Sequence, residues 1–348
     1  MTSRGLWTDE HEAFERPRRR TRPRTKERPD YSGAELGMVV TVDRGRYQTL
    51  VDGREVTATK ARQLGRTAVI VGDRVRLVGD TSGAEGTLAR IVEVEKRRTV
   101  LRRTADDDDP YERPIVANAD QLVIVTALAD PPPRTGMIDR ILVAGYDAGL
   151  APLLCLTKAD LAAPDELLAA YRPLGVPVQA VRPGADLTEL RRALDGHRSV
   201  FVGHSGVGKS TLVNALIPGA KRAIGAVNEV TGRGRHTSSS ALALPLTGDD
   251  GAPLPDTWVV DTPGIRSFGL GWVEPDRVVE AFDDLAGGLA DCPRGCTHTA
   301  DSPGCGLDAW VAAGHAGPSG AARLASLRRL LGNRLAPSGA EDAASSED

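Results

Sequence analysis

The chain has 348 residues, of which 41% are apolar and 26% are charged. This length predicts two or three domains, and the apolar content excludes a wholly disordered chain. The net charge is only −3, but residues 1–105 contain 23 basic and 15 acidic residues, a surplus of +8, which leaves −11 for the rest. The basic first third therefore indicates a polyanionic partner that the total charge conceals.

Residues 1–35 are predicted to form a disordered basic arm, because they are rich in arginine and proline. Residues 36–98 then show five short runs of alternating or β-branched apolar residues, separated by turns such as Asp52-Gly53. Five strands in this length predict a small β-barrel, either OB-like or SH3-like. The predicted strands are Val39–Val42, Gln48–Val51, Glu55–Thr59, Val75–Val78 and Leu88–Val94.

A linker containing Arg102, Arg103 and the acidic run Asp106–Asp109 is predicted next. Over residues 105–270 strand-like and helix-like segments alternate, which predicts a parallel sheet with helices on its faces. The predicted strands are Gln121–Thr126, Leu153–Thr157, Val200–Gly203 and Trp258–Asp261. The predicted helices are Met137–Ala148, Asp165–Tyr171, Leu187–Leu194 and Lys209–Leu216.

A phosphate-binding loop of the form G-x-x-x-x-G-K-[ST] joins one of these strands to the next helix. Its glycines let successive backbone N–H groups surround phosphate oxygens, and the helix N-terminus favours negative charge. Lys209 is expected to act in catalysis by contacting the β- and γ-phosphates, and Ser210 to ligate Mg²⁺. The loop is Gly203, His204, Ser205, Gly206, Val207, Gly208, Lys209, Ser210 and Thr211.

Two further motifs point to a guanine nucleotide. Asp261-Thr262-Pro263-Gly264 follows a predicted strand, so Asp261 is expected to hold Mg²⁺ and Gly264 to approach the γ-phosphate. Thr157-Lys158-Ala159-Asp160 ends an earlier strand, and Asp160 can accept hydrogen bonds from guanine N1 and N2, which adenine lacks. Thr157 stands where most GTPases have asparagine. An ATPase is the weaker alternative.

The order of these motifs is unusual, because the base-recognition motif precedes the phosphate-binding loop and the Asp261–Gly264 motif comes last. A circular permutation of the GTPase sheet explains this order, since chain termini at the surface tolerate it. The polar, basic segment 232–239 between the last two motifs is expected to be a switch. His236 is the candidate catalytic residue there, and Thr237 or Ser238 the candidate Mg²⁺ ligand.

Residues 274–335 contain three of the four cysteines and a histidine within 14 residues, followed by a predicted helix over residues 321–333. Three thiolates and one imidazole form a complete tetrahedral set, which predicts one structural Zn²⁺ with no open position. The predicted ligands are Cys292, Cys296, His298 and Cys305. Residues 336–348 are predicted to be a disordered acidic tail, and Cys155 to lie in the core.

The permuted order, the phosphate-binding loop, the Gly-Arg-Gly-Arg-His-Thr switch and the cysteine cluster together resemble the bacterial ribosome small-subunit-dependent GTPase A (RsgA) family. The resemblance covers about residues 36–334. It implies an OB fold, a circularly permuted GTPase domain and a zinc-containing helical domain. It also implies binding to the small ribosomal subunit and its rRNA late in maturation, with GTP hydrolysis that the subunit stimulates.

The motifs predict a multidomain GTP hydrolase that uses Mg²⁺, and the resemblance implies that it assists assembly of the small ribosomal subunit. The alternative is a structural RNA-binding protein that uses GTP as a binding switch with negligible turnover. No apolar run approaches the length of a membrane span, so we expect no membrane association and a cytoplasmic location. We also expect the protein to be a monomer.

Overall fold

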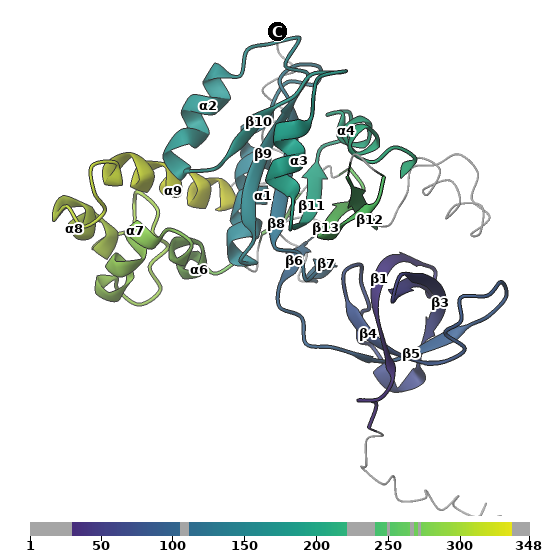
Figure 1. Cartoon of the computed structure of the whole chain (residues 1–348). Helices are drawn as coiled ribbons and strands as arrows, with labels where there is room; N and C mark the ends of the chain where they lie inside the picture. Colours follow the sequence, from purple (N-terminus) through teal and green to yellow (C-terminus); the bar gives the residue numbers. More distant parts are fainter. Residues whose placement is uncertain are drawn as a thin grey trace, which may run out of the picture. The chain divides into compact units, whose positions relative to one another are not determined.

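The computed structural model describes residues 30–104, 111–220, 241–248, 251–264, 268–270 and 273–335. Its first five strands close into a barrel in the order β1-β2-β3-β5-β4, and β4 pairs back with β1 (Figure 1). Alternate side chains, among them Val39, Val56 and Ile91, fill its interior. This pairing, with β3 and β5 parallel, confirms the OB-like barrel. The strands are β1 Glu35–Asp43, β2 Arg46–Val51, β3 Arg54–Lys60, β4 Arg74–Gly79 and β5 Ala89–Val94, with the short helix η1 Arg62–Leu64.

Part of the predicted linker instead forms strand β6 (Val100–Arg103), which pairs antiparallel with β7 (Arg113–Ala117), and this corrects the sequence interpretation. Leu101 and Val116 are buried, and this apolar contribution was obscured by the arginines around Leu101. The end of β7 lies against the turn before β4, where Gly72 has φ +87°. A Cβ atom on Gly72 would lie 2.0 Å from the carbonyl oxygen of Ala117, so only glycine fits there.

The sheet of the α/β region has the strand order β10-β9-β8-β11-β13-β12. Its first five strands are parallel, and β12 is antiparallel to β13. Strand β8 is buried at every position, as expected for a central strand covered on both faces. The strands are β8 Gln121–Ala127, β9 Ala151–Thr157, β10 Val178–Ala180, β11 Arg198–Gly203, β12 Leu242–Thr247 and β13 Pro253–Asp261.

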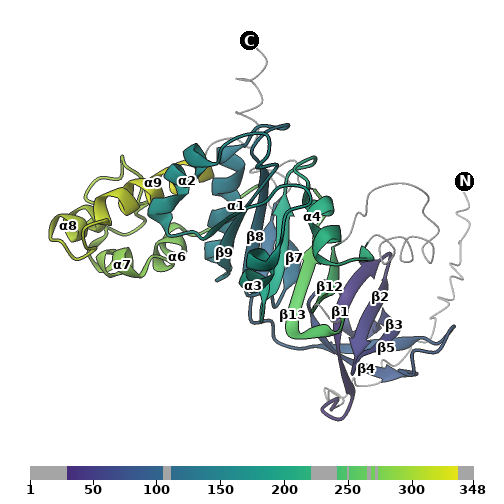
Figure 2. The same ribbon diagram turned by 45° about the horizontal axis from the view of Figure 1, so that its top comes forward.

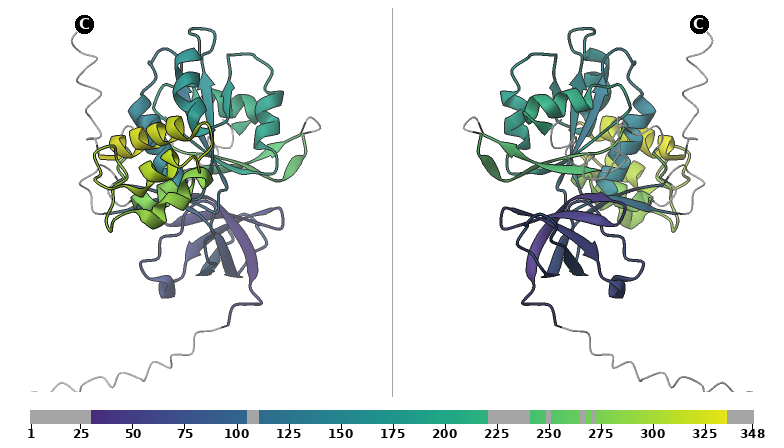
Figure 3. Two further views of the ribbon diagram at one scale, coloured as in Figure 1. Left: turned by 90° about the vertical axis from the view of Figure 1, so that its left-hand side faces the viewer. Right: turned by 90° about the vertical axis from the view of Figure 1, so that its right-hand side faces the viewer.

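Helices cover both faces of this sheet (Figures 2 and 3). Because side chains alternate along a strand, Ile124 packs with helices α1 and α2 on one face, while Val123 packs with α3 and α4 on the other. The helices are α1 Thr135–Asp147, α2 Asp165–Tyr171, α3 Thr188–Leu194 and α4 Lys209–Leu216, with η2 Arg172–Leu174. All four predicted helices are present.

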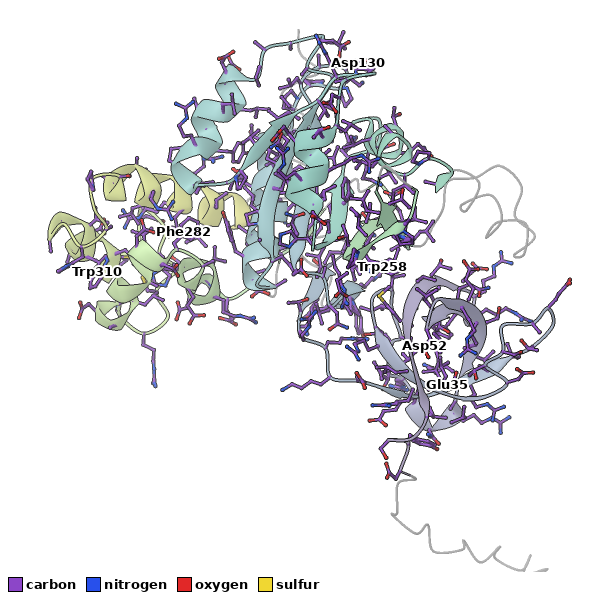
Figure 4. All side chains as sticks on the ribbon, viewed as in Figure 1. Glu35, Asp52, Asp130, Trp258, Phe282 and Trp310 are labelled. Carbon is purple, nitrogen blue, oxygen red and sulfur yellow. The ribbon has the colours of Figure 1, made fainter. Side chains whose placement is uncertain are left out.

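The C-terminal helices share the core of the α1 face. Leu327 and Leu330 of α9 belong to the same cluster of buried side chains as Ile141 of α1, and Figure 1 shows these two helices side by side. Phe282, labelled in Figure 4, lies with its ring centroid 5.1 Å from that of Tyr146 in α1. The helices are α6 Pro275–Glu280, α7 Asp283–Ala286, α8 Gly306–Ala312 and α9 Gly320–Leu335, with η3 Gly287–Asp291.

A buried ionic network strengthens this contact. Asp139 of α1 is fully buried; it accepts a hydrogen bond of 2.9 Å from the Tyr171 hydroxyl and pairs with the guanidinium of Arg329 in α9 at 2.5 Å. Removing the guanidinium of Arg329 would leave the buried carboxylate of Asp139 without this counter-ion, and losing one partner of a buried pair costs about 3–5 kcal/mol. The C-terminal region is therefore fixed to the α/β region by packing and by charge.

Several short elements were absent from the sequence prediction: β10, β12 and the helices α6, α7 and α8. Residues 1–29 of the predicted arm over residues 1–35 lie outside the described residues, as does the predicted tail over residues 336–348. The last residue of the predicted arm, Glu35, belongs instead to strand β1. Among the helices of the described ranges, none has the length and apolar character needed to cross a bilayer.

Candidate functional site

The carboxyl ends of the five parallel strands point to one edge of the sheet, and each is followed by a loop of the candidate site. Ligands of open α/β sheets bind at this edge. Strand order therefore brings together motifs that lie far apart in the sequence. The five loops are residues 128–134 after β8, 157–160 after β9, 181–187 after β10, 203–208 after β11 and 261–264 after β13.

The phosphate-binding loop has the backbone shape that its glycines predict. Gly206 and Gly208 both have φ +86°, a conformation that side chains with a Cβ rarely adopt. Helix α4 begins directly after Gly208, at Lys209. The loop therefore ends in a helix N-terminus, whose free N–H groups favour an anion.

Lys209 lies inside the site rather than on the surface. Its side chain is only 6% exposed, and its ammonium group contacts the carboxylate of Asp261 and the carbonyl oxygen of Thr262. The hydroxyl of Thr262 donates a hydrogen bond of 2.7 Å to the carbonyl oxygen of Phe201 in β11. The two motifs are thus joined at the ends of neighbouring strands.

Gly264, the last residue of the Asp261–Gly264 motif, lies close to the phosphate-binding loop. A Cβ atom on Gly264 would lie 3.3 Å from Cα of Ser205 and 3.4 Å from its backbone nitrogen. Ser205 is exposed and therefore accessible to a ligand. A phosphate bound by the loop would meet Gly264 at this point.

Thr157 connects the base-recognition loop to the phosphate-binding loop. Its hydroxyl lies 3.2 Å from the carbonyl oxygen of Thr126 and contacts that of Val207. Although threonine stands here in place of asparagine, its hydroxyl therefore still makes a hydrogen bond to the phosphate-binding loop. Lys158 follows with φ +56°, and its ammonium group contacts the carbonyl oxygen of Asp130. Asp130, labelled in Figure 4, belongs to the loop after β8 and was not a predicted site residue.

A cavity of about 500 Å³ adjoins these loops. Its wall includes Thr157 and Lys158 of the base-recognition loop, Gly208 and Thr211 at the start of α4, and residues 181–187. Asp160 is exposed and does not belong to the wall. Sequence analysis missed residues 181–187, because β10 is only three residues long and gave no strand signal.

Two predicted switch residues, His236 and Thr237, lie outside the described residues, as does the rest of segment 221–240. The described Mg²⁺ candidates are Ser210, which is exposed, and Asp261, whose side chain is 14% exposed. A serine hydroxyl and a carboxylate suit Mg²⁺, which prefers oxygen ligands and retains several waters.

The four predicted zinc ligands converge on one point. The ligating atoms of Cys292, Cys296, His298 and Cys305 all lie within 4.8 Å of one another. Nδ1 of His298 is 3.5 Å from Sγ of Cys292 and 3.7 Å from Sγ of Cys305. In a tetrahedral site with normal Zn–N and Zn–S bond lengths, nitrogen and sulfur lie about 3.5 Å apart. The donor set and its spacing therefore fit Zn²⁺.

Asp276 supports this cluster from outside. Its carboxylate lies 2.7 Å from Nε2 of His298, which leaves Nδ1 directed to the sulfurs. A carboxylate on the second ring nitrogen fixes the tautomer of a zinc-binding histidine. Sequence analysis missed Asp276 because it lies 22 residues from His298. Burial raises the pKa of Cys305, and a bound cation would offset this effect by favouring the thiolate.

The fourth cysteine differs from the other three. Cys155 is fully buried in β9, and burial raises its pKa to about 12. It lies in the apolar cluster on the α3 and α4 face. The structure therefore places it in the core, as its sequence context predicts.

Comparisons with known proteins agree with this geometry. The family model described as "RsgA GTPase" matches residues 94–271. Two relatives carry the name "Small ribosomal subunit biogenesis GTPase RsgA". The protein from Azotobacter vinelandii is 36% identical to this chain, and the match covers 97% of this chain and 98% of that protein. The protein from Pseudomonas aeruginosa is also 36% identical, and the match covers 95% of this chain and 96% of that protein.

Two solved structures are also similar. YjeQ from Thermotoga maritima has a TM-score of 0.59 and 26% identity, covering 86% of this chain and 98% of its own. YloQ, described as a circularly permuted GTPase, has a TM-score of 0.56 and 21% identity, with coverage of 89% and 99%. The second likeness supports the fold alone.

Proposed function

Because the chain belongs to the RsgA GTPase family, we propose that this GTP hydrolase acts as a late assembly factor of the small ribosomal subunit. The observation that supports this proposal most strongly is the meeting of three nucleotide motifs at one sheet edge, beside a cavity large enough for a base and ribose. The relatives whose names specify the small subunit match nearly the whole chain.

In the proposed site the phosphates lie over the N-terminus of α4 and the guanine lies in the cavity beside Lys158. Backbone N–H groups from His204 to Thr211 surround the phosphates, while Lys209 neutralises charge that develops on the γ-phosphate. Gly264 approaches the same phosphate from the Asp261 motif. Asp160 accepts hydrogen bonds from guanine N1 and N2, and Ala159 belongs to the same loop.

Mg²⁺ would be held by Ser210 and Asp261, with Thr237 as a third candidate, and it would neutralise phosphate charge when bound. His236 is proposed to orient the attacking water. Zn²⁺ would be held by the three cysteines and His298 and would stabilise the C-terminal helices, because a closed ligand set supplies folding energy rather than chemistry.

The partner is proposed to be the small subunit with its rRNA, recognised partly through the basic barrel. Arg62 and Arg66 are exposed in the segment between β3 and β4 and suit contacts to phosphate. A ribosomal partner also supports a cytoplasmic location. We propose that the protein acts there as a monomer.

Binding to purified small subunits tests this proposal. We expect tighter binding with a non-hydrolysable GTP analogue than with GDP, and an association constant that falls linearly with salt on logarithmic axes. The double variant Arg62→Glu and Arg66→Glu should bind more weakly and with a shallower salt slope. Arg172→Glu, an exposed arginine outside the barrel, is the matched control. Absence of binding in every nucleotide state would contradict the proposal.

A further inference from the structure

The cavity beside Lys158 contains a cation to which the proposed function gives no role. Arg182 lines its wall and is exposed. Its carbonyl oxygen accepts a hydrogen bond of 3.1 Å from the backbone N–H of Ala185, but its guanidinium makes no hydrogen bond or ion pair with the residues that the structure describes. Its position is fixed by the neighbouring Val181. The backbone N–H of Val181 donates to Leu156 at 2.7 Å, and its carbonyl accepts from Ala159 at 3.2 Å.

The other side chains on the wall that can donate hydrogen bonds near the base end already have protein partners. The ammonium group of Lys158 contacts Asp130, and the hydroxyl of Thr157 contacts Thr126 and Val207. The guanidinium of Arg191 donates to the carbonyl oxygens of Thr247 and Leu216.

Pro183, which follows Arg182 on the wall, has no N–H group, and the N–H of Ala185 already donates to the carbonyl oxygen of Arg182. Among the described residues, the guanidinium of Arg182 is therefore the side-chain donor that this end of the cavity leaves available.

Strand order places Arg182 at the base end rather than at the phosphates. The loop after β10 is three strands from the loop after β11, which corresponds to about 14 Å at the usual spacing of neighbouring strands. The phosphates belong to the β11 loop. A guanidinium in the β10 loop therefore lies where the far end of the nucleotide would be.

The chemistry of guanine matches this donor. Guanine presents two acceptors, O6 and N7, on one edge, and a bidentate arginine is their most common partner in protein–DNA complexes. Adenine presents N7 but replaces O6 with an amino donor, which a guanidinium cannot satisfy. Asp160 is proposed to contact the opposite part of the ring, at N1 and N2.

We propose that Arg182 donates hydrogen bonds to O6 and N7 of guanine and is a second determinant of base specificity. This inference rests on the proposed placement of the base in the cavity. Two loops would then recognise the two edges of guanine. Asp160, after β9, accepts hydrogen bonds from N1 and N2, and Arg182, after β10, donates hydrogen bonds to O6 and N7.

Calorimetric titration of the full chain with GTP and 7-deaza-GTP, which lacks the N7 acceptor, tests the inference. The wild type should bind 7-deaza-GTP about tenfold more weakly than GTP. Arg182→Ala and Arg182→Gln should bind the two nucleotides equally, at about the wild-type affinity for 7-deaza-GTP or below. Arg192→Ala, which removes an exposed arginine of α3, should keep the wild-type ratio.

A second titration separates failure of the inference from failure of the site. Asp160→Asn should weaken GTP binding and favour xanthosine triphosphate if the base lies in this cavity. Suppose that Asp160→Asn responds in this way, but the ratio of GTP to 7-deaza-GTP affinity is the same in the wild type and in Arg182→Ala. The base site would then stand, and only the role of Arg182 would be overturned. If Asp160→Asn binds GTP normally, the proposed base site and the inference both fail.

Discussion

At the scale of single residues, the buried position of Lys209 links two motifs. Its ammonium group contacts Asp261 and Thr262, so the cation that is proposed to contact phosphate also holds the end of β13 beside the loop after β11. The chain contains six lysines and 38 arginines, yet a lysine occupies this place. A compact ammonium fits a narrow buried site that a planar guanidinium does not.

We therefore predict that Lys209→Arg fails as completely as Lys209→Ala. Both variants should lose about 100-fold or more in kcat/KM for GTP, because the charge that stabilises the transition state is absent or misplaced. Steady-state phosphate release measures the effect. Lys96→Arg, at an exposed position, should behave as wild type. Substantial turnover by Lys209→Arg would show that charge alone suffices.

Sequence patterns predict geometry best where the residues of a site are close together in the chain, and the binding roles of these residues stay predictions. The phosphate-binding loop and the cysteine cluster each occupy one short segment, so their spacing alone predicts their geometry. Sequence patterns did not predict Asp276 or Arg182, whose places beside the cysteine cluster and on the cavity wall depend on tertiary structure. Asp276 reaches His298 across 22 residues, and Arg182 joins the cavity only because β10 pairs beside β9.

At the scale of elements, strong periodicity decided what could be predicted. The five barrel strands and the helices of the α/β region follow their apolar patterns closely. Strand β6 was missed because Arg102 and Arg103 mask one buried residue, Leu101, and its partner β7 begins after the acidic run. The short helices α6 to α8 were missed because four to seven residues cannot show a clear helical period.

The support that Asp276 gives to the cysteine cluster predicts a measurable effect on metal affinity. Asp276→Asn should weaken zinc binding about 10–100-fold, because the carboxylate that orients His298 is lost. Competition with a chromophoric chelator measures this change. Asp283→Asn, an exposed acid at the start of α7, is the matched control and should bind zinc as wild type does.

Loss of a ligand should have a larger effect. Cys292→Ser should fail to retain zinc through gel filtration, whereas Cys155→Ala should retain it, because Cys155 lies in the core away from the cluster. Equal zinc affinity in Asp276→Asn and the wild type would remove the carboxylate from the proposed support of the site.

At the scale of the whole molecule, the permuted order has a structural consequence. The chain passes from the Asp261 motif directly to the C-terminal helices, and Phe268 and Leu270 on the way are buried in the core that includes α1 and α9. The guanidinium of Arg140 in α1 donates to the carbonyl oxygen of Phe268 at 2.7 Å. Phe268 and Leu270 are therefore packed against the α/β region and the C-terminal helices.

The distribution of charge along the chain suggests that the partner and the nucleotide bind in different regions. The surplus of +8 lies in the arm and barrel, and the remaining residues sum to −11. Long-range attraction to a polyanion would therefore act on the first third of the chain, while the nucleotide site lies in the acidic remainder. Binding of the partner and hydrolysis of the nucleotide are thus expected to use different regions of one chain.

GTP turnover measured with and without purified small ribosomal subunits tests the central claim most directly. We predict slow hydrolysis by the isolated chain and a large acceleration by the subunits, as partner proteins accelerate other GTPases by up to about 10⁵-fold. The acceleration should disappear in Lys209→Ala and weaken as salt rises. Hydrolysis that is fast without subunits and unchanged by them would contradict the account, and no turnover in either case would indicate a GTP-dependent binding protein instead.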